Sequence, residues 1–112
     1  MGRALAPLRD EGIFILGSGM SFHNMRGFGN LRGRVIVETF DQWLRETATF
    51  DPTPRDQRLV QWSQAPGARL AHPREEHLLP LMVIAGAAGG DRGTMAFSGK
   101  MLGARISTYH FG

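Results

Sequence analysis

The sequence His-Pro-Arg-Glu-Glu-His-Leu-Leu-Pro-Leu at residues 72–81 places two imidazoles and two carboxylates directly before an apolar run from Leu78 to Ala88. Pro73 has the fixed φ that suits a first helical position. Pro80 lacks an N–H and leaves the carbonyl of Glu76 without its helical partner. The pattern predicts a polar turn that leads into a buried helix. Polar groups at such an entry point can hold a metal ion or a substrate.

The two histidines of this stretch, His72 and His77, are five residues apart, which is about 140° around a helix of roughly 3.6 residues per turn. They therefore cannot bind one ion from a single helical face, as the histidines of an H-E-x-x-H helix do. If His77 is a metal ligand, its co-ligands come from elsewhere. A purely structural alternative is also open, in which His72 is a capping or surface residue and His77 is buried and bonded to a carbonyl.

A second pattern lies nearer the amino-terminal end. Residues 2–10 have helical spacing, and Gly12 is suited to ending a helix. Four consecutive apolar residues, Ile13 to Leu16, then predict a strand buried on both faces. A Gly-Ser-Gly loop without the Lys of a P-loop leads on to His23. Since open α/β sheets place ligands beyond the carboxyl ends of strands, His23 is a candidate for chemistry, with an exposed loop histidine as the alternative.

The rest of the chain alternates helical and extended patterns. Apolar spacing predicts helices near 38–49, 54–64 and 74–88. Residues 94–97 and 105–111 have strand character, with residues 98–100 lying between them, and His110 on the last strand is expected to be structural. The sequence therefore predicts an α/β fold over residues 1–112, in which a central β-sheet that includes the first strand is flanked by helices.

Composition excludes several classes of protein. With 42% hydrophobic residues and no cysteine, the 112-residue chain has a globular composition and no disulfide or thiolate site. No apolar run reaches the roughly 18 residues of a membrane span and no signal peptide is visible, so we expect a cytoplasmic protein without membrane contact. The net charge of +3 comes with twelve scattered arginines and one lysine. Because nucleic-acid sites need clustered basic residues, we expect no nucleic-acid partner.

The two patterns together resemble a known family. Gly-Ser-Gly-x-x-x-His-Asn at residues 17–24 and His-Pro-x-x-Glu-His-x-x-Pro-Leu at residues 72–81 resemble, in this order, the class III extradiol ring-cleavage dioxygenases. This is the LigB-like superfamily, and the resemblance is closest to its 4,5-DOPA dioxygenase-type branch. Members of that branch are longer, and their amino-terminal half supplies two of the metal-binding histidines. The resemblance implies that this chain is a partial domain, the carboxyl-terminal half of such an enzyme.

The resemblance also implies a reaction and a set of roles. The reaction is extradiol cleavage of a catechol-type substrate by dioxygen at non-haem Fe(II), with Zn(II) able to occupy the same site. His77 is implied as a metal ligand, and His23 as a histidine at the metal that transfers protons. Imidazole suits both tasks, since it binds divalent iron and zinc and titrates near pH 6.5. Glu76 is expected to hold His77 by a hydrogen bond, Asn24 to shape the pocket or orient the substrate, and His72 to support the site without binding metal.

Two functional hypotheses follow from the implied truncation. In the first, the chain is an enzyme half that needs an amino-terminal half, or a second copy of itself, to complete its metal site. In the second, it is an inactive remnant that acts as a folded or partner-binding module.

Overall fold

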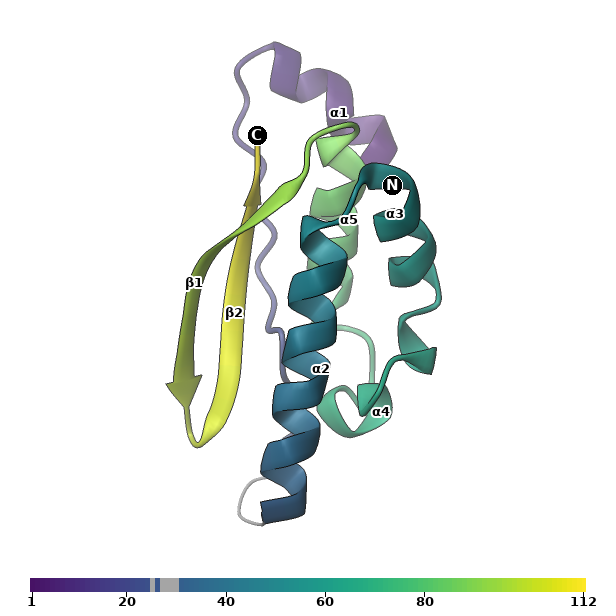
Figure 1. Ribbon diagram of the computed structural model, residues 1–112. Coiled ribbons are helices and arrows are strands. Elements are labelled where there is room, and N and C mark those ends of the chain that lie inside the picture. Colours follow the sequence, from purple (N-terminus) through teal and green to yellow (C-terminus); the bar gives the residue numbers. More distant parts are fainter. Residues whose placement is uncertain (25, 27–30) are drawn as a thin grey trace.

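The computed structural model describes residues 1–24, 26 and 31–112 of the chain. Its helices and strands follow one another as shown in Figure 1: α1 (Gly2–Asp10), α2 (Leu31–Thr49), α3 (Pro52–Val60), the 3-10 helix η1 (Trp62–Gln64), α4 (Ala68–Ala71), α5 (Leu79–Ala88), β1 (Gly93–Met101) and β2 (Ala104–Phe111). The structure thus combines helices with a two-stranded antiparallel sheet. None of the described helices is both long and apolar enough to cross a bilayer.

The strands form one hairpin on one side of the molecule. Gly93 pairs with Phe111 at the open end and Met101 with Ala104 at the closed end, with one irregularity in register near Met95. The turn consists of Leu102 and Gly103, both at positive φ (51° and 83°). The first strand is therefore longer than the expected 94–97, because residues 98–100 lie inside β1. Two left-handed residues close a tight hairpin at the point where the twist of the strands requires it.

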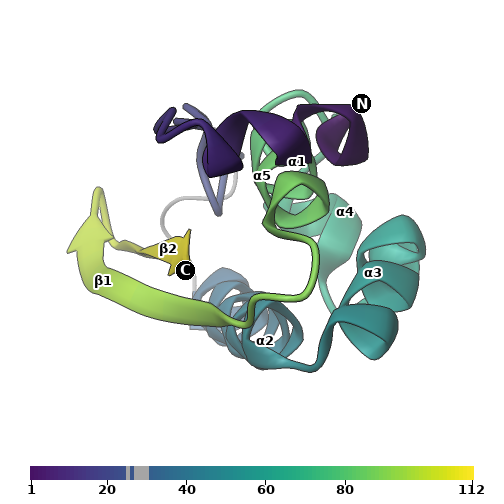
Figure 2. The same cartoon turned by 90° about the horizontal axis from the view of Figure 1, so that it is seen from above.

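The helices enclose the core between them and the hairpin. Seen from above, α5 lies between α1 and α2, with the hairpin to one side and α3 to the other (Figure 2). α2 presents Val37, Phe40 and Leu44 inward at three- and four-residue spacing, as an amphipathic helix must. The other large buried side chains of this core are Phe22, Leu59, Trp62 and Leu78.

Close helix packing holds α1 against α5. A Cβ on Gly2 would lie 2.2 Å from the carbonyl oxygen of Val83, and a Cβ on Gly86 would lie 3.1 Å from the Cα of Gly2. Both glycines are therefore needed where the two backbones approach. The expected helix over residues 2–10 is confirmed, and Gly12 after it has φ +77°, in the left-handed region that glycine tolerates.

Several sequence-based boundaries are wrong. α2 begins seven residues before the expected start at 38, since the structure places it at Leu31–Thr49. α3 ends at Val60, and η1 covers the rest of the expected helix. The helix expected from 74 begins only at Leu79, because Pro80 fits its first turn and the preceding residues form bends and turns. The short helix α4 was not expected at all.

The expected strand at Ile13–Leu16 is also wrong. The segment is extended but unpaired. It leads away from α1 and runs antiparallel to β2 (Figure 1). Among the described residues, no backbone hydrogen bond involves the N–H or C=O groups of residues 14–19. Phe14 and Leu16 are 85% and 78% exposed, whereas Ile15 between them is half-buried. Alternation of this kind is that of a strand with only one face covered.

Candidate active site

Two histidines that are far apart in the sequence meet in the fold. The rings of His23 and His77 are stacked, with 3.7 Å between centroids and 21° between ring planes. His23 lies in the loop after the extended segment, and His77 lies in the turn before α5. Both are half-buried, so their rings remain open to a ligand. The two residues that the sequence singled out for chemistry are thus brought together.

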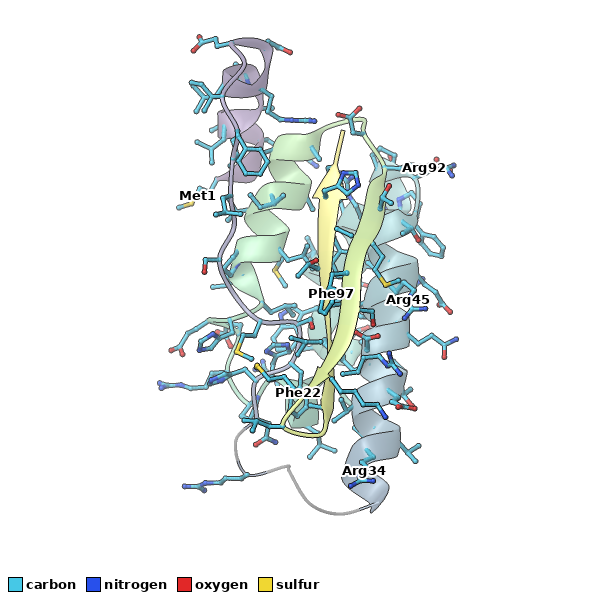
Figure 3. The ribbon with its side chains drawn as sticks, turned by 90° about the vertical axis from the view of Figure 1, so that its left-hand side faces the viewer. Met1, Phe22, Arg34, Arg45, Arg92 and Phe97 are labelled. Atoms are coloured by element: carbon cyan, nitrogen blue, oxygen red, sulfur yellow. The ribbon has the colours of Figure 1, made fainter. Side chains whose placement is uncertain are left out.

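Backbone contacts hold the two loops against each other. The N–H of Met20 donates to the carbonyl oxygen of His77 at 2.9 Å, and the N–H of His23 donates to that of Ala71 at 3.0 Å. Gly19 permits this approach, because a Cβ there would lie 2.3 Å from the His77 carbonyl oxygen. Phe22 of the same loop is buried and packs in the hydrophobic core; it is labelled in Figure 3. The Gly-Ser-Gly sequence therefore serves close packing.

Asn24 and Glu76 lie beside the histidine pair in the sequence and differ in their contacts. The Nδ2 of Asn24 donates to the carbonyl oxygen of Leu70 at 2.7 Å, so this side chain ties the loop to α4. Glu76 is largely exposed and lies 3.8 Å from the guanidinium of Arg74. Within the described part of the chain, no hydrogen bond joins Glu76 to His77. The expected orienting bond is therefore absent from this arrangement.

His72 is the buried histidine of the site. It is fully buried, and its Nε2 lies 2.9 Å from the carbonyl oxygen of Ser21. The sequence-based alternatives are reversed here, since the role of a buried imidazole bonded to a carbonyl belongs to His72 and not to His77. Burial lowers the pKa of His72, the bond to Ser21 raises it, and the charges of His23 and His77 lower it further. No sequence signal identified Ser21 as its partner.

A groove of about 1000 Å³ opens next to the histidine pair. His77 lies on its wall, together with residues of the extended segment, α5 and β2. Figure 3 shows the extended segment and β2 running alongside each other, with α5 behind them. The β2 residue Tyr109 borders it too, and burial, followed by the nearby charge of Asp41, raises the pKa of its phenol above the ordinary value. The groove is mostly apolar, so it suits an aromatic or polypeptide occupant.

The donor set fits part of a metal site. Imidazole nitrogen is a suitable ligand for divalent iron and for zinc, and the rings of His23 and His77 lie against each other. Over residues 1–24, 26 and 31–112, no cluster of three or more His, Cys, Asp or Glu side chains is arranged to hold an ion. A three-ligand site that leaves positions open for reactants thus requires donors beyond these two.

Comparison with known proteins identifies the family. The model of the family described as the catalytic LigB subunit of aromatic ring-opening dioxygenase matches residues 1–111. The chain therefore belongs to the LigB family.

Individual relatives agree with this assignment. Dioxygenase tasH of Hapsidospora irregularis is 39% identical over 125 aligned residues, which cover 100% of the chain and 38% of that protein. The 4,5-DOPA dioxygenase extradiol of Beta vulgaris is 42% identical over 91 residues, which cover 80% of the chain and 33% of that protein. The crystal structure of an uncharacterized protein from Escherichia coli K12 superposes with a TM-score of 0.79 at 31% identity, covering 96% of the chain and 46% of that protein. The chain thus matches a fragment of the fold and spans about a third of the length of these curated relatives.

Proposed function

We propose that this chain carries two active-site histidines of an extradiol dioxygenase, which opens a catechol-type ring with dioxygen at a non-haem divalent metal. The observation that carries the proposal is the stacking of His23 on His77 at 3.7 Å, beside a groove that His77 lines. Membership of a family described by aromatic ring opening supports this chemistry. We propose Fe(II) as the metal for turnover and Zn(II) as an alternative occupant of the same site.

The two histidines have different tasks in this proposal. His77 holds the metal through a ring nitrogen. A divalent metal held by His77 would supply the Lewis-acid and dioxygen chemistry of ring cleavage. His23 takes the proton of a catechol hydroxyl group at a ring nitrogen and returns a proton as the ring opens, which imidazole does readily near neutral pH. The half-buried position of His23 keeps it in reach of substrate.

The remaining metal ligands come, in this proposal, from a polypeptide that corresponds to the amino-terminal half of the relatives. The match covers only 33% of the Beta vulgaris protein, so most of that protein's length has no counterpart here. The groove between the extended segment and β2 offers such a polypeptide an apolar surface. A second copy of the chain is the other potential source of ligands.

Complementation tests the proposal. The chain is combined, fused or in trans, with the part of the Beta vulgaris relative that lies outside the match, and dioxygen uptake and the yellow semialdehyde product are followed with a catechol and Fe(II). His23→Ala should abolish turnover and largely retain the metal, whereas His77→Ala should lose both. Gln57→Ala, an exposed position on α3, is the matched control and should retain both.

The competing hypothesis, an inactive remnant, predicts no turnover in any of these assemblies. Titration of the isolated chain with Zn(II) gives a separate measurement. We expect weak binding that His77→Ala weakens further, since the chain offers two imidazoles and not a full ligand set. Tight binding that survives His77→Ala would refute the assignment of this ligand.

A further inference from the structure

The loop of His23 and the turn of His77 are linked through one side chain. The imidazole of His72 lies with Nε2 2.9 Å from the carbonyl oxygen of Ser21. A carbonyl oxygen can only accept, so Nε2 carries the hydrogen and donates it. The backbone N–H of His72 already donates to the carbonyl oxygen of Ala68 at 2.8 Å, where α4 ends. The backbone N–H of His72 is thus already used, and the imidazole is the group of this residue that donates to Ser21.

The core fixes where this donor lies. His72 has 0% of its surface exposed, and its ring meets two aromatic rings edge-on. The ring of Phe40 lies at 5.5 Å and 64°, and that of Trp62 at 6.2 Å and 88°. These rings belong to α2 and η1, so elements outside both loops hold the imidazole. Its bond then fixes the Ser21 carbonyl relative to the core.

A second bond, two residues further along, runs in the opposite direction. The N–H of His23 donates to the carbonyl oxygen of Ala71 at 3.0 Å. Together with the bond from His72 to Ser21, it sets the register between the two segments, as successive bonds set the register of paired strands. With that register fixed, the His23 ring lies 3.7 Å from the ring of His77.

We propose that His72 is a positioning residue, whose Nε2–H bond to the Ser21 carbonyl stacks His23 on His77. It acts on catalysis only through those two histidines. The catalytic consequence rests on the proposed function, but the stacking is a property of the folded chain and is measured without turnover.

Two substitutions separate the donor from the ring. His72→Phe keeps an aromatic ring against Phe40 and Trp62 and removes the donor. His72→Gln removes the ring and keeps an N–H donor, because the Nε2 of glutamine is as many bonds from the backbone as the Nε2 of histidine. Stacked rings shield each other's protons, so the imidazole proton shifts in an NMR spectrum of the histidine-labelled chain report the stack. The exposed His110 is the unstacked reference in the same spectrum.

At pH 8, the ring protons of His23 and His77 should resonate upfield of those of His110 in the parent chain and in His72→Gln. In His72→Phe this upfield displacement should be lost. The proposal is overturned if His72→Phe keeps the displacement, or if His72→Gln loses it as completely. Should circular dichroism show that His72→Phe does not fold, His72→Gln decides alone by keeping or losing the displacement.

The same pair of variants has a kinetic signature in the complemented enzyme. His72→Phe should lower kcat with little change in KM, and His72→Gln should recover most of the loss, since a misplaced proton-transfer group costs rate more than binding. If the parent assembly shows no turnover, the proposed function fails, while the NMR result still decides whether His72 positions the histidine pair.

Discussion

The buried guanidinium of Arg55 donates from Nη2 to the carbonyl oxygen of Ala85 at 2.9 Å and to that of Gly89 at 3.1 Å. Its Nη1 donates to the carbonyl oxygen of Asp91 at 2.7 Å, and its Nε pairs with the carboxylate of Asp56 at 2.9 Å. The last carbonyls of a helix have no partner within the helix, and a cation there also suits the helix dipole. One side chain of α3 therefore caps the carboxyl end of α5.

Replacing Arg55 by methionine should destabilise the chain strongly. The variant leaves the buried carbonyl oxygen of Ala85 and the part-buried ones of Gly89 and Asp91 without this donor. Each bond to a charged group contributes about 1.5–3 kcal/mol. We expect the free energy of unfolding, measured in urea, to fall by roughly 3 kcal/mol or more on this scale. Arg58→Met is the control, since Arg58 mainly lies over the rings of Phe50 and Trp43, contacts of about 0.5–1 kcal/mol. Equal losses in both variants would contradict the capping role.

Gly19→Ala should separate the two histidine loops. Its Cβ would lie 2.3 Å from the carbonyl oxygen of His77 and 3.0 Å from Cγ of Pro80. Backbone must then move, at a cost of typically 1–3 kcal/mol for overpacking. Urea unfolding should show this loss, and the NMR signature of stacking should weaken. Gly90→Ala, where nothing lies within 4 Å of the added atom, should change neither.

Stability should depend on pH through His72. Burial lowers the pKa of His72 below its ordinary value of 6.5. The bond to Ser21 raises the pKa and the charges of His23 and His77 lower it, but the net direction is downward. Between the folded pKa and about 6.5, the unfolded chain therefore binds more protons at this residue than the folded chain. The contribution of neutral His72 to the free energy of unfolding is therefore fully present above about pH 6.5 and is lost as the pH falls below it. Urea unfolding at pH 8 and pH 5.5 should show the decline.

The variant His72→Gln has no titrating group at this position and is the control for that measurement. Its free energy of unfolding should be lower at pH 8, because the ring contacts are gone, but should fall less between pH 8 and pH 5.5. His23 and His77 remain in both chains, so the difference isolates His72. An equally steep decline in the variant would show that other groups carry the pH dependence.

The sequence predicted the elements whose stability is local. The aromatic and leucine spacing of α2 and the glycine after α1 each depend on neighbours within a few residues. The strand expected at Ile13–Leu16 needed neighbouring strands to pair with, and a local apolar pattern does not show whether such strands are present. Its apolar run indicates burial on two faces, but within the described residues only one face is covered, and the segment stays unpaired.

For the site, the sequence found the two histidines that meet but not what holds them. Motif spacing singled out His23 and His77, and the structure stacks them. The bond from His72 to Ser21 and the close approach at Gly19 are tertiary contacts between distant segments. No local pattern encodes such contacts, which is why a capping or surface role for His72 stayed open beside the supporting role that the resemblance implied.

The last prediction concerns the segment that the fold leaves open. Phe14 and Leu16 are largely exposed, and the backbone groups of residues 14–19 form no backbone hydrogen bonds within the described part of the chain. Unpaired strand-like backbone and exposed apolar side chains favour addition of another strand. We therefore expect the complementing part of a relative to pair with this segment across the groove that separates it from β2.

The double variant Phe14→Lys/Leu16→Lys should retain the stability of the parent chain, because these side chains are 85% and 78% exposed and support no folded contact of consequence. Docking of the complementing polypeptide, measured by calorimetry, should weaken roughly 100-fold or more, since burying each side chain is worth about 1.5–3 kcal/mol. Val60→Lys, at an 82% exposed position on α3, should leave docking unchanged. Hydrogen exchange should show amide protection at residues 14–19 on docking to the parent chain. Docking that survives the double variant would place the partner elsewhere on the chain. Protection that appears only when the parent chain self-associates would identify the partner as a second copy.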